Sequence, residues 1–253
     1  MIVSFVNQKG GVGKTTTTVN LAAYLASRRK KILLVDLDPQ GNATSGLGIY
    51  RGSLAKSIYD AIILEERDGF IKKDVRENLD LAPSSIDLAG AEVELTNLSD
   101  RNTRLKTALD SLREDYDYIL IDCPPSLGLL TLNALTASDY LVVPIQAEYY
   151  ALEGVSQLME TVSLVKESLN PDLELMGVVV TMYDKRTQLS QQVRDEVKNY
   201  FKDKCFNTAI PRNVRLSEAP SFGQTIHEFA RISKGAISYG KLGNEFLERV
   251  SKL

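Results

Sequence analysis

The segment from Lys9 to Thr16 constrains the fold of this chain more than any other feature. It reads Lys-Gly-Gly-Val-Gly-Lys-Thr-Thr, and it lies between an apolar run at Ile2–Val6 and a stretch of good helix formers at Thr17–Ser27. A glycine-rich loop between a strand and a helix is the setting of a P-loop, in which backbone N–H groups and the helix N-terminus hold a polyphosphate. The sequence therefore predicts a nucleotide-binding α/β fold.

The residues of this loop have separate expected roles. Lys14 is expected to meet the β- and γ-phosphates, and the Thr15 hydroxyl to bind Mg²⁺. Where the general pattern has a glycine, five residues before Gly13, this chain has Gln8, and it carries an additional lysine at Lys9. This is the deviant, signature-lysine form of the loop. The predicted ATP-binding residues of the loop are Lys9, Gly10, Gly11, Val12, Gly13, Lys14, Thr15 and Thr16.

Further short apolar runs predict the other strands of a sheet. Segments with helical spacing separate most of them, and this alternation predicts an α/β fold with a mostly parallel twisted sheet flanked by helices on both faces. Without a repeat or a linker, we expect a single domain over residues 1–253 with no N-terminal operator-binding domain, and we interpret the irregular residues 46–75 as a helical insertion. The predicted strands after the first are Ile32–Val35, Leu79–Ala82, Tyr118–Ile121, Tyr140–Val143, Leu175–Thr181 and Thr208–Ile210.

Charge and cysteine content exclude several classes of protein. The net charge of −3 argues against a protein that is basic over its whole surface, so nucleic-acid binding would need a local patch. Cys123 and Cys205 lack metal-ligand spacing and suggest no disulfide framework. Neither a signal peptide nor an apolar stretch of about 18 residues is visible, so we expect a cytoplasmic protein.

Carboxylates follow two of the predicted strands. Asp122 ends one apolar run and is expected to hold Mg²⁺ through water, while Asp36 and Asp38 follow another run at the same edge of the sheet. Cys123 occupies the position where many ATPases have a catalytic glutamate, so we expect Asp38 to position the attacking water. The alternative is that Asp38 caps the following turn. The chain has no Asn-Lys-x-Asp guanine motif, which favours adenine.

These motifs and several longer segments resemble the ParA/Soj partition ATPases, within the wider family that includes MinD and the nitrogenase iron protein. Residues 36–48, 122–128, 146–154 and 210–220 carry the resemblance, which covers nearly the whole chain. It implies slow, Mg²⁺-dependent ATP hydrolysis by a homodimer that forms face to face around ATP. In that dimer the catalytic residues would be Lys14, Asp38 and a Lys9 that reaches the partner's phosphates in trans.

The same resemblance places Pro211 and Asn213 against the adenine and ribose, although an ordinary turn would also explain these residues. It further implies that the ATP-bound dimer binds double-stranded DNA without sequence preference and is nucleoid-associated. The segment from Lys185 to Leu216 contains eight basic residues and three acidic ones. A solvated helix would explain the four-residue spacing of three of the basic residues equally well. The predicted DNA contacts are Arg186, Arg194, Lys198, Lys202 and Arg215.

A ParB-type protein is the expected partner that stimulates hydrolysis. The sequence leaves open whether a replication-initiation protein is another partner, and whether the cargo is a chromosome or a plasmid. A MinD-like membrane-surface ATPase is the main alternative, but it needs a basic amphipathic tail. The tail here has mixed charges and an apolar stripe expected to dock on the core, at Tyr239, Leu242, Phe246, Val250 and Leu253.

We therefore expect no membrane partner. A metabolic enzyme of the same superfamily, such as an ATP-dependent ligase or an iron–sulfur reductase, is the second alternative. An iron protein needs cysteines that meet across a dimer, whereas Cys123 is expected to be a small buried residue. His227 is the only histidine, and we expect it at the surface or in a loop.

Overall fold

A seven-stranded sheet forms the centre of the computed structural model, which describes residues 1–148 and 153–253. The strand order is β3-β4-β2-β5-β1-β6-β7, and every neighbouring pair is parallel except β3 with β4. Part of the 146–154 segment, on which the family resemblance partly rests, lies outside the described residues. The strands are β1 (Ile2–Phe5), β2 (Ile32–Asp36), β3 (Lys72–Arg76), β4 (Leu79–Ala82), β5 (Tyr118–Asp122), β6 (Tyr140–Gln146) and β7 (Glu174–Thr181).

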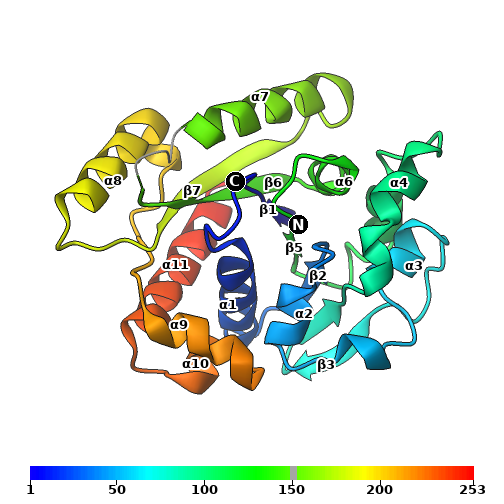
Figure 1. The fold of residues 1–253 in the computed structure, drawn as a ribbon, viewed down its shortest axis with the longest axis horizontal. Coiled ribbons are helices and arrows are strands. Elements are labelled where there is room, and N and C mark those ends of the chain that lie inside the picture. The colour runs from blue at the N-terminus through cyan, green and yellow to red at the C-terminus, as the bar shows by residue number, and fades with distance from the viewer. Residues whose placement is uncertain (149–152) are drawn as a thin grey trace.

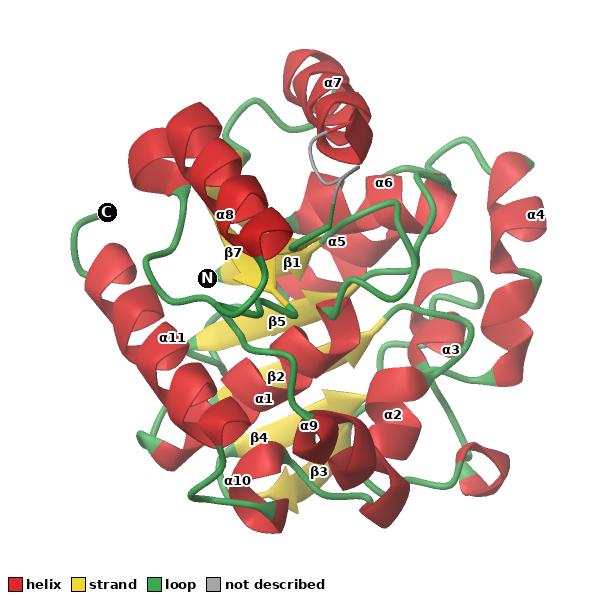
Figure 2. Ribbon diagram, turned by 60° about the vertical axis from the view of Figure 1, so that its left-hand side comes forward, coloured by secondary structure: helices red, strands yellow, loops and turns green. Residues whose placement is uncertain are grey.

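Helices cover both faces of this sheet (Figures 1 and 2). One apolar cluster joins a sheet face to α1 and α11, and a second joins the opposite face to helices between α3 and α8. The predicted fold class is thereby confirmed. The helices are α1 (Lys14–Ser27), α2 (Asn42–Gly46), α3 (Ile58–Ile62), α4 (Ala91–Thr96), α5 (Arg104–Asp110), α6 (Leu129–Ala137), α7 (Glu153–Ser168), α8 (Gln188–Phe201), α9 (Val214–Glu218), α10 (Ile226–Phe229) and α11 (Lys234–Val250).

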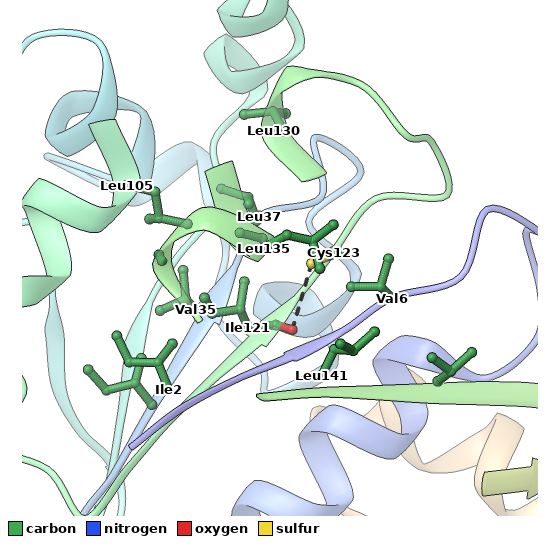
Figure 3. Packing of buried hydrophobic residues seen from close by; sticks show 14 of the residues in the cluster. Ile2, Val6, Val35, Leu37, Leu105, Ile121, Cys123, Leu130, Leu135 and Leu141 are labelled. Atoms are coloured by element: carbon green, nitrogen blue, oxygen red, sulfur yellow. Dashed lines mark hydrogen bonds between the residues drawn. The ribbon is translucent and has the colours of Figure 1, made fainter. Parts of the chain in front are cut away.

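The second of these clusters contains Cys123. Figure 3 shows its side chain among those of Val6, Leu37 and Leu135, directly after the end of β5. The thiol is fully buried, and this burial raises its pKa far above the ordinary value, so it is held as a neutral thiol. The prediction of a small buried residue at this position is confirmed.

Two sequence predictions about the sheet are wrong. Thr208–Ile210 forms no strand, because the isolated bridges lie on either side of it, at Cys205 and at Pro211. Ile210 donates its N–H to the Val180 carbonyl over 2.8 Å, and Pro211 then has no N–H with which to continue the pairing. Residues 46–75 are not wholly a helical insertion, since β3 pairs with β4 at the sheet edge. Its sequence, Lys-Lys-Asp-Val-Arg, lacks the apolar pattern of a buried strand, which is usual for a charged edge strand.

The C-terminal helix α11 docks on the core as predicted. Tyr239, Leu242 and Phe246 are almost completely buried, and the Tyr239 hydroxyl is 3.1 Å from the Thr17 hydroxyl of α1. Leu253 is the exception, because the helix ends at Val250 and the Leu253 side chain is exposed. Among the residues that the structure describes, none of the helices combines the length and apolarity needed to cross a bilayer. His227 lies on α10, half-buried, with its ring 5.8 Å from that of Tyr24.

Candidate functional site

The P-loop connects β1 to α1 at the carboxyl edge of the parallel strands. Gly11 and Gly13 have φ values of 75° and 86°, a left-handed backbone that favours glycine. Gly13 is also the N-cap residue of α1, so the first helical N–H groups and the positive end of the helix face out of the loop. A Cβ at Gly10 or Gly11 would meet no atom within 4 Å. The loop therefore borders open space into which phosphate groups could fit.

Two side chains outside the loop fix its position. The Thr181 hydroxyl, at the end of β7, donates to the Val12 carbonyl over 2.7 Å. The Asn7 carboxamide accepts from the Lys9 N–H over 2.9 Å and donates to the Pro144 carbonyl over 2.7 Å. Sequence reasoning missed both anchors, because a threonine at a strand end and an asparagine before a loop match no motif.

Two adjoining cavities form at this edge of the sheet. The first, about 550 Å³, is lined by the P-loop together with Asp38 and Gln40, and the second, about 370 Å³, by Pro211 and Asn213 among others. Gly13, Thr16, Met182 and Pro220 line both. Because the cavities share these residues, one bound molecule could place a polyphosphate in the first and a base with its sugar in the second. The structure thus brings the predicted phosphate and adenine residues together.

Lys14 is held at the bottom of the phosphate cavity. Its side chain is largely buried, and its ammonium group donates to the Lys9 carbonyl over 3.3 Å. Burial lowers the pKa of Lys14, while the nearby Asp122 carboxyl acts in the opposite direction. A lysine that already points into the cavity can bind phosphate oxygens without first being ordered.

Asp122 carries an unsatisfied oxygen beside this lysine. The residue is fully buried at the end of β5, and Thr18 donates to its Oδ1 over 3.3 Å, whereas its Oδ2 has no hydrogen-bond partner. Burial, and secondly repulsion from Asp36, raise the pKa of Asp122 well above its ordinary range, while the nearby Lys14 acts in the opposite direction. An unpaired buried carboxylate oxygen is costly unless something neutralises it.

The carboxylate of Asp36 lies beside Asp122 but is occupied by protein donors. The two residues are register partners on β2 and β5. Asp36 accepts from the Thr44 N–H and hydroxyl over 2.7 and 2.6 Å. Burial, partly offset by these bonds, raises its pKa to about 6. Asp36 therefore fixes the 38–44 turn to the sheet, and Thr44 is another residue that sequence reasoning missed.

Asp38 borders the phosphate cavity and also caps a turn. The strand ends at Asp36, so the alternation that would align the two carboxylates does not continue. The Oδ1 of Asp38 accepts from the Gln40 N–H over 2.9 Å, and its carbonyl accepts from the Ser84 hydroxyl over 2.7 Å. The turn-capping alternative is thus present in the structure, and a role in water positioning stays a prediction for the same carboxylate.

The residues around Asp122 fit a magnesium ion. Within residues 1–148 and 153–253 no cluster of three or more histidine, cysteine or acidic side chains could enclose a metal. Mg²⁺ does not require such a cluster, because it usually keeps several waters and binds one or two protein oxygens together with nucleotide phosphates. Thr15 in the first turn of α1 and the unpaired Oδ2 of Asp122 would supply those oxygens, one directly and the other through water.

Replacing Asp122 by asparagine should stabilise the protein in the absence of nucleotide and metal. The change removes a buried carboxyl group that faces Asp36, and we expect the melting temperature at pH 7.5 to rise by about 2–4 °C for each kcal/mol of repulsion removed. The stabilisation should be smaller at pH 5, because a carboxyl group with a raised pKa loses more of its charge as the pH falls. Thermal melts of wild type and Asp122→Asn at both pH values, with and without Mg²⁺ and ATP, test this. An unchanged or lower melting temperature for the variant at pH 7.5 would contradict it.

Lys9 lies outside the phosphate cavity of its own chain. Its side chain is 45% exposed, and its ammonium group is 3.5 Å from an Oε2 of Glu148. Glu148 also lies 3.8 Å from the guanidinium of Arg212. The cavity lining contains the glycines next to Lys9 but not Lys9 itself.

The predicted DNA contacts lie in different environments. Arg186 is strongly exposed and makes a two-point ion pair with Asp184, at 2.7 and 3.0 Å. Arg194 is half-buried, donates to the Asn207 carbonyl over 3.2 Å and stacks on Tyr183. Lys198 is exposed on α8. Lys202 is not on that helix face, because α8 ends at Phe201 and Lys202 has a φ of 49°.

Arg215, the last of the predicted contacts, lies on α9. It pairs with Glu218 over 2.8 Å and is 60% exposed. The structure therefore leaves Lys198, Lys202, Arg186 and Arg215 accessible, but it does not form a single stripe from Arg194 to Lys202 as the spacing predicted.

Comparison with known proteins adds to this geometry. A family model described as an AAA domain matches residues 1–175. The sporulation initiation inhibitor protein Soj of Bacillus subtilis is 57% identical over 96% of this chain and 97% of its own length. The chromosome partitioning protein ParA of Myxococcus xanthus is 53% identical over 98% of this chain and 88% of its own.

A solved structure shares the fold. The cobyrinic acid a,c-diamide synthase of Mycobacterium smegmatis, with a bound ATP analogue and magnesium, has a TM-score of 0.85 and 38% identity. The match covers 99% of this chain and 95% of the synthase chain.

Proposed function

This chain belongs to the ParA/Soj family of chromosome-partitioning ATPases, and we propose that it is a dimerisation switch that binds DNA only with ATP. As a member of that family it is a segregation ATPase that uses ATP and magnesium. The proposed cycle has ATP joining two subunits, the dimer binding DNA without sequence preference, and hydrolysis separating the subunits. A ParB-type protein would stimulate the last step.

The position of Lys9 carries this proposal. Each chain has a cavity for the phosphates and a cavity for the base, but its signature lysine points along the surface toward Glu148. A lysine that is outside its own site and exposed is available to a second subunit. In a symmetric dimer with facing P-loops, each Lys9 would reach the other subunit's phosphates, and each site would be complete only in the dimer.

The other residues supply binding and positioning. Lys14 and the loop N–H groups would bind the phosphates, and Pro211 and Asn213 would contact the base and ribose. Asp38 would orient the attacking water from the edge of the phosphate cavity. Thr15 and Asp122 would hold a magnesium ion, which would supply positive charge close to the phosphates. With few groups to transfer protons, we expect slow turnover in the absence of a partner.

DNA sedimentation with ATP, with ADP and without nucleotide tests the switch. We expect wild type to sediment with a non-specific duplex only in ATP, and to be released as salt is raised, because phosphate contacts release counterions. The Lys14→Ala variant should lose nucleotide affinity and remain unbound in all three conditions. If both proteins bound DNA equally without nucleotide, the switch proposal would be wrong. Co-pelleting with anionic vesicles in place of DNA would favour the MinD-like alternative.

The diamide synthase likeness raises a metabolic function as the other candidate. The partitioning relatives are more similar in sequence over nearly the same span, at 57% and 53% identity against 38%. Both cysteines are buried in the described structure, and the pKa of each thiol is raised by burial. We therefore favour segregation, and a loss of nucleotide-dependent DNA binding would reopen the metabolic alternative.

A further inference from the structure

A second hollow lies on the other side of the residues that line the base cavity. This basic groove, of about 780 Å³, lies between the loop after β7 and the first turns of α11. Its lining includes Tyr183 and Val214 and five basic residues against a single carboxylate, that of Asp184. The basic residues are Lys185, Arg186, Arg212, Lys234 and Lys241. Four of them, all except Arg186, are not among the predicted DNA contacts.

The start of α11 adds to the positive potential of this groove. Lys234 is the first residue of the helix, whose first turn contains no acidic residue. A lysine at the positive end of a helix dipole is unfavourable unless an anion lies nearby. Because α11 has 17 residues and is anchored by the buried Tyr239 and Phe246, its N-terminus is a fixed feature of the groove. An anion bound in the groove would be stabilised by the helix N-terminus and by the charges of Lys234 and Lys241.

The single acid of the groove is already neutralised. Asp184 makes its two-point contact with Arg186, and this contact lowers the pKa of Asp184 to about 2. The carboxylate also accepts from the Arg186 N–H over 3.0 Å, so it holds the loop in place. Arg212 lies 3.8 Å from Glu148 in an exposed pair that contributes little, and the charges of Lys185, Lys234 and Lys241 are left to an external anion.

The groove and the base cavity share a thin wall. Pro211, Arg212 and Val214 line both hollows. The wall is held to the loop after β7 by two backbone bonds, from the Tyr183 N–H to the Ile210 carbonyl over 3.0 Å and from the Arg212 N–H to the Tyr183 carbonyl over 3.2 Å. Because these bonds fix the backbone of the wall to that loop, a shift of the wall toward one hollow also changes the shape of the other.

We propose that the basic groove binds a backbone phosphate of DNA and that the wall from Pro211 to Val214 couples this phosphate site to the nucleotide site within one subunit. The proposal rests on the proposed DNA-binding function and deepens it. Nucleotide state would then act on DNA in two ways, by joining two grooves in the dimer and by adjusting each groove through the wall.

The affinity part is tested by fluorescence anisotropy with a labelled duplex in ATP at several salt concentrations. Lys234→Ala/Lys241→Ala should reduce the slope of log affinity against log salt by about 0.9 for each DNA phosphate that is no longer neutralised, and weaken binding about tenfold or more. The matched control is Lys31→Ala/Lys72→Ala, which removes two exposed lysines elsewhere and should bind as wild type does. Asp184→Asn, which keeps an oxygen for the Arg186 N–H, should bind more tightly.

The outcomes separate this inference from the function on which it rests. If wild type failed to bind the duplex, the DNA-binding function itself would fail. If wild type bound and Lys234→Ala/Lys241→Ala bound with the same affinity and salt slope, the phosphate site would be refuted. A variant that kept DNA binding but lost stimulation by a partner protein would also refute it, and would assign the groove to an acidic protein surface.

The coupling part is tested with ADP, which should not support the sandwich dimer. The salt concentration is first lowered until anisotropy shows that the labelled duplex binds the ADP form, which at higher salt stays unbound. A saturating short duplex should then change the affinity of wild type for a fluorescent ADP analogue by about fivefold or more, because coupling between two sites is reciprocal. Lys234→Ala/Lys241→Ala should abolish that change while retaining the affinity measured without DNA. An ADP affinity that the duplex leaves unchanged in wild type would refute coupling through the wall.

Discussion

Replacing Lys9 by alanine should lower the rate of ATP hydrolysis by about 10³-fold or more, the effect of losing a finger residue that acts in trans. Folding should be almost unaffected, because the ion pair with Glu148 that this change removes is exposed and such pairs contribute little. Steady-state ATPase assays with DNA and partner, together with a thermal melt, measure both quantities.

Glu148→Gln is the matched control for this variant. It breaks the same ion pair but keeps the lysine, so it should retain far more activity than Lys9→Ala. Equal losses in the two variants would assign the effect to the ion pair. A Lys9→Ala protein with wild-type hydrolysis would refute the role of the signature lysine.

The Asp38→Ala variant should have its hydrolysis lowered by about 10²–10⁴-fold while still binding ATP, since the carboxylate would position water and not phosphate. The ATP-bound dimer should therefore accumulate and remain on DNA. Size-exclusion chromatography with light scattering in ATP, followed by DNA sedimentation, measures the dimer and its retention.

The turn capped by Asp38 requires its own control. Asp38→Asn keeps an oxygen that can accept from the Gln40 N–H, so the turn should be preserved while the charge is lost. We expect it to hydrolyse as slowly as Asp38→Ala. If Asp38→Asn instead retained wild-type activity, Asp38 would act only as the turn cap that the structure shows.

The sequence was sufficient to predict the parts of this fold that follow simple periodic rules. β1, β2, β4, β5, β6 and β7 are buried apolar runs, and the P-loop between β1 and α1 is fixed by its glycines. β3 escaped prediction because an edge strand paired on one side has no need of an apolar pattern. Thr208–Ile210 was predicted as a strand but lies between two isolated bridges, at Cys205 and Pro211, and whether such a run joins a sheet depends on tertiary position.

The candidate site was predicted unevenly for a related reason. Lys14, Thr15 and Asp122 belong to motifs with fixed spacing. The structure places Lys14 and Thr15 in the lining of the phosphate cavity and buries Asp122 near Lys14. Thr44, Thr181 and Asn7 act through hydrogen bonds to residues far along the chain, so no local pattern marks them. For Lys202 a regular pattern was present but misleading. Its four-residue spacing predicted a place on the face of a helix, whereas α8 ends one residue earlier, at Phe201.

The spacing of residues along the sequence did not predict the basic groove either. Its charges come from the loop after β7, from the wall at Arg212 and from the start of α11, and only the fold brings these segments together. Composition gave a net charge of −3, which conceals a local cluster of this kind.

Mixing two inactive variants tests most directly the central claim that each active site is shared by two subunits. In a mixed dimer, the Asp38→Ala subunit would donate its intact Lys9 to the Lys9→Ala subunit, whose own Asp38 is intact, and one site would be complete. We therefore expect an equal mixture of Lys9→Ala and Asp38→Ala to recover ATP hydrolysis to as much as about a quarter of the wild-type rate, as random pairing in a two-fold dimer predicts. If the mixture remained as inactive as its two components, Lys9 would not act in trans and the shared-site account would be wrong.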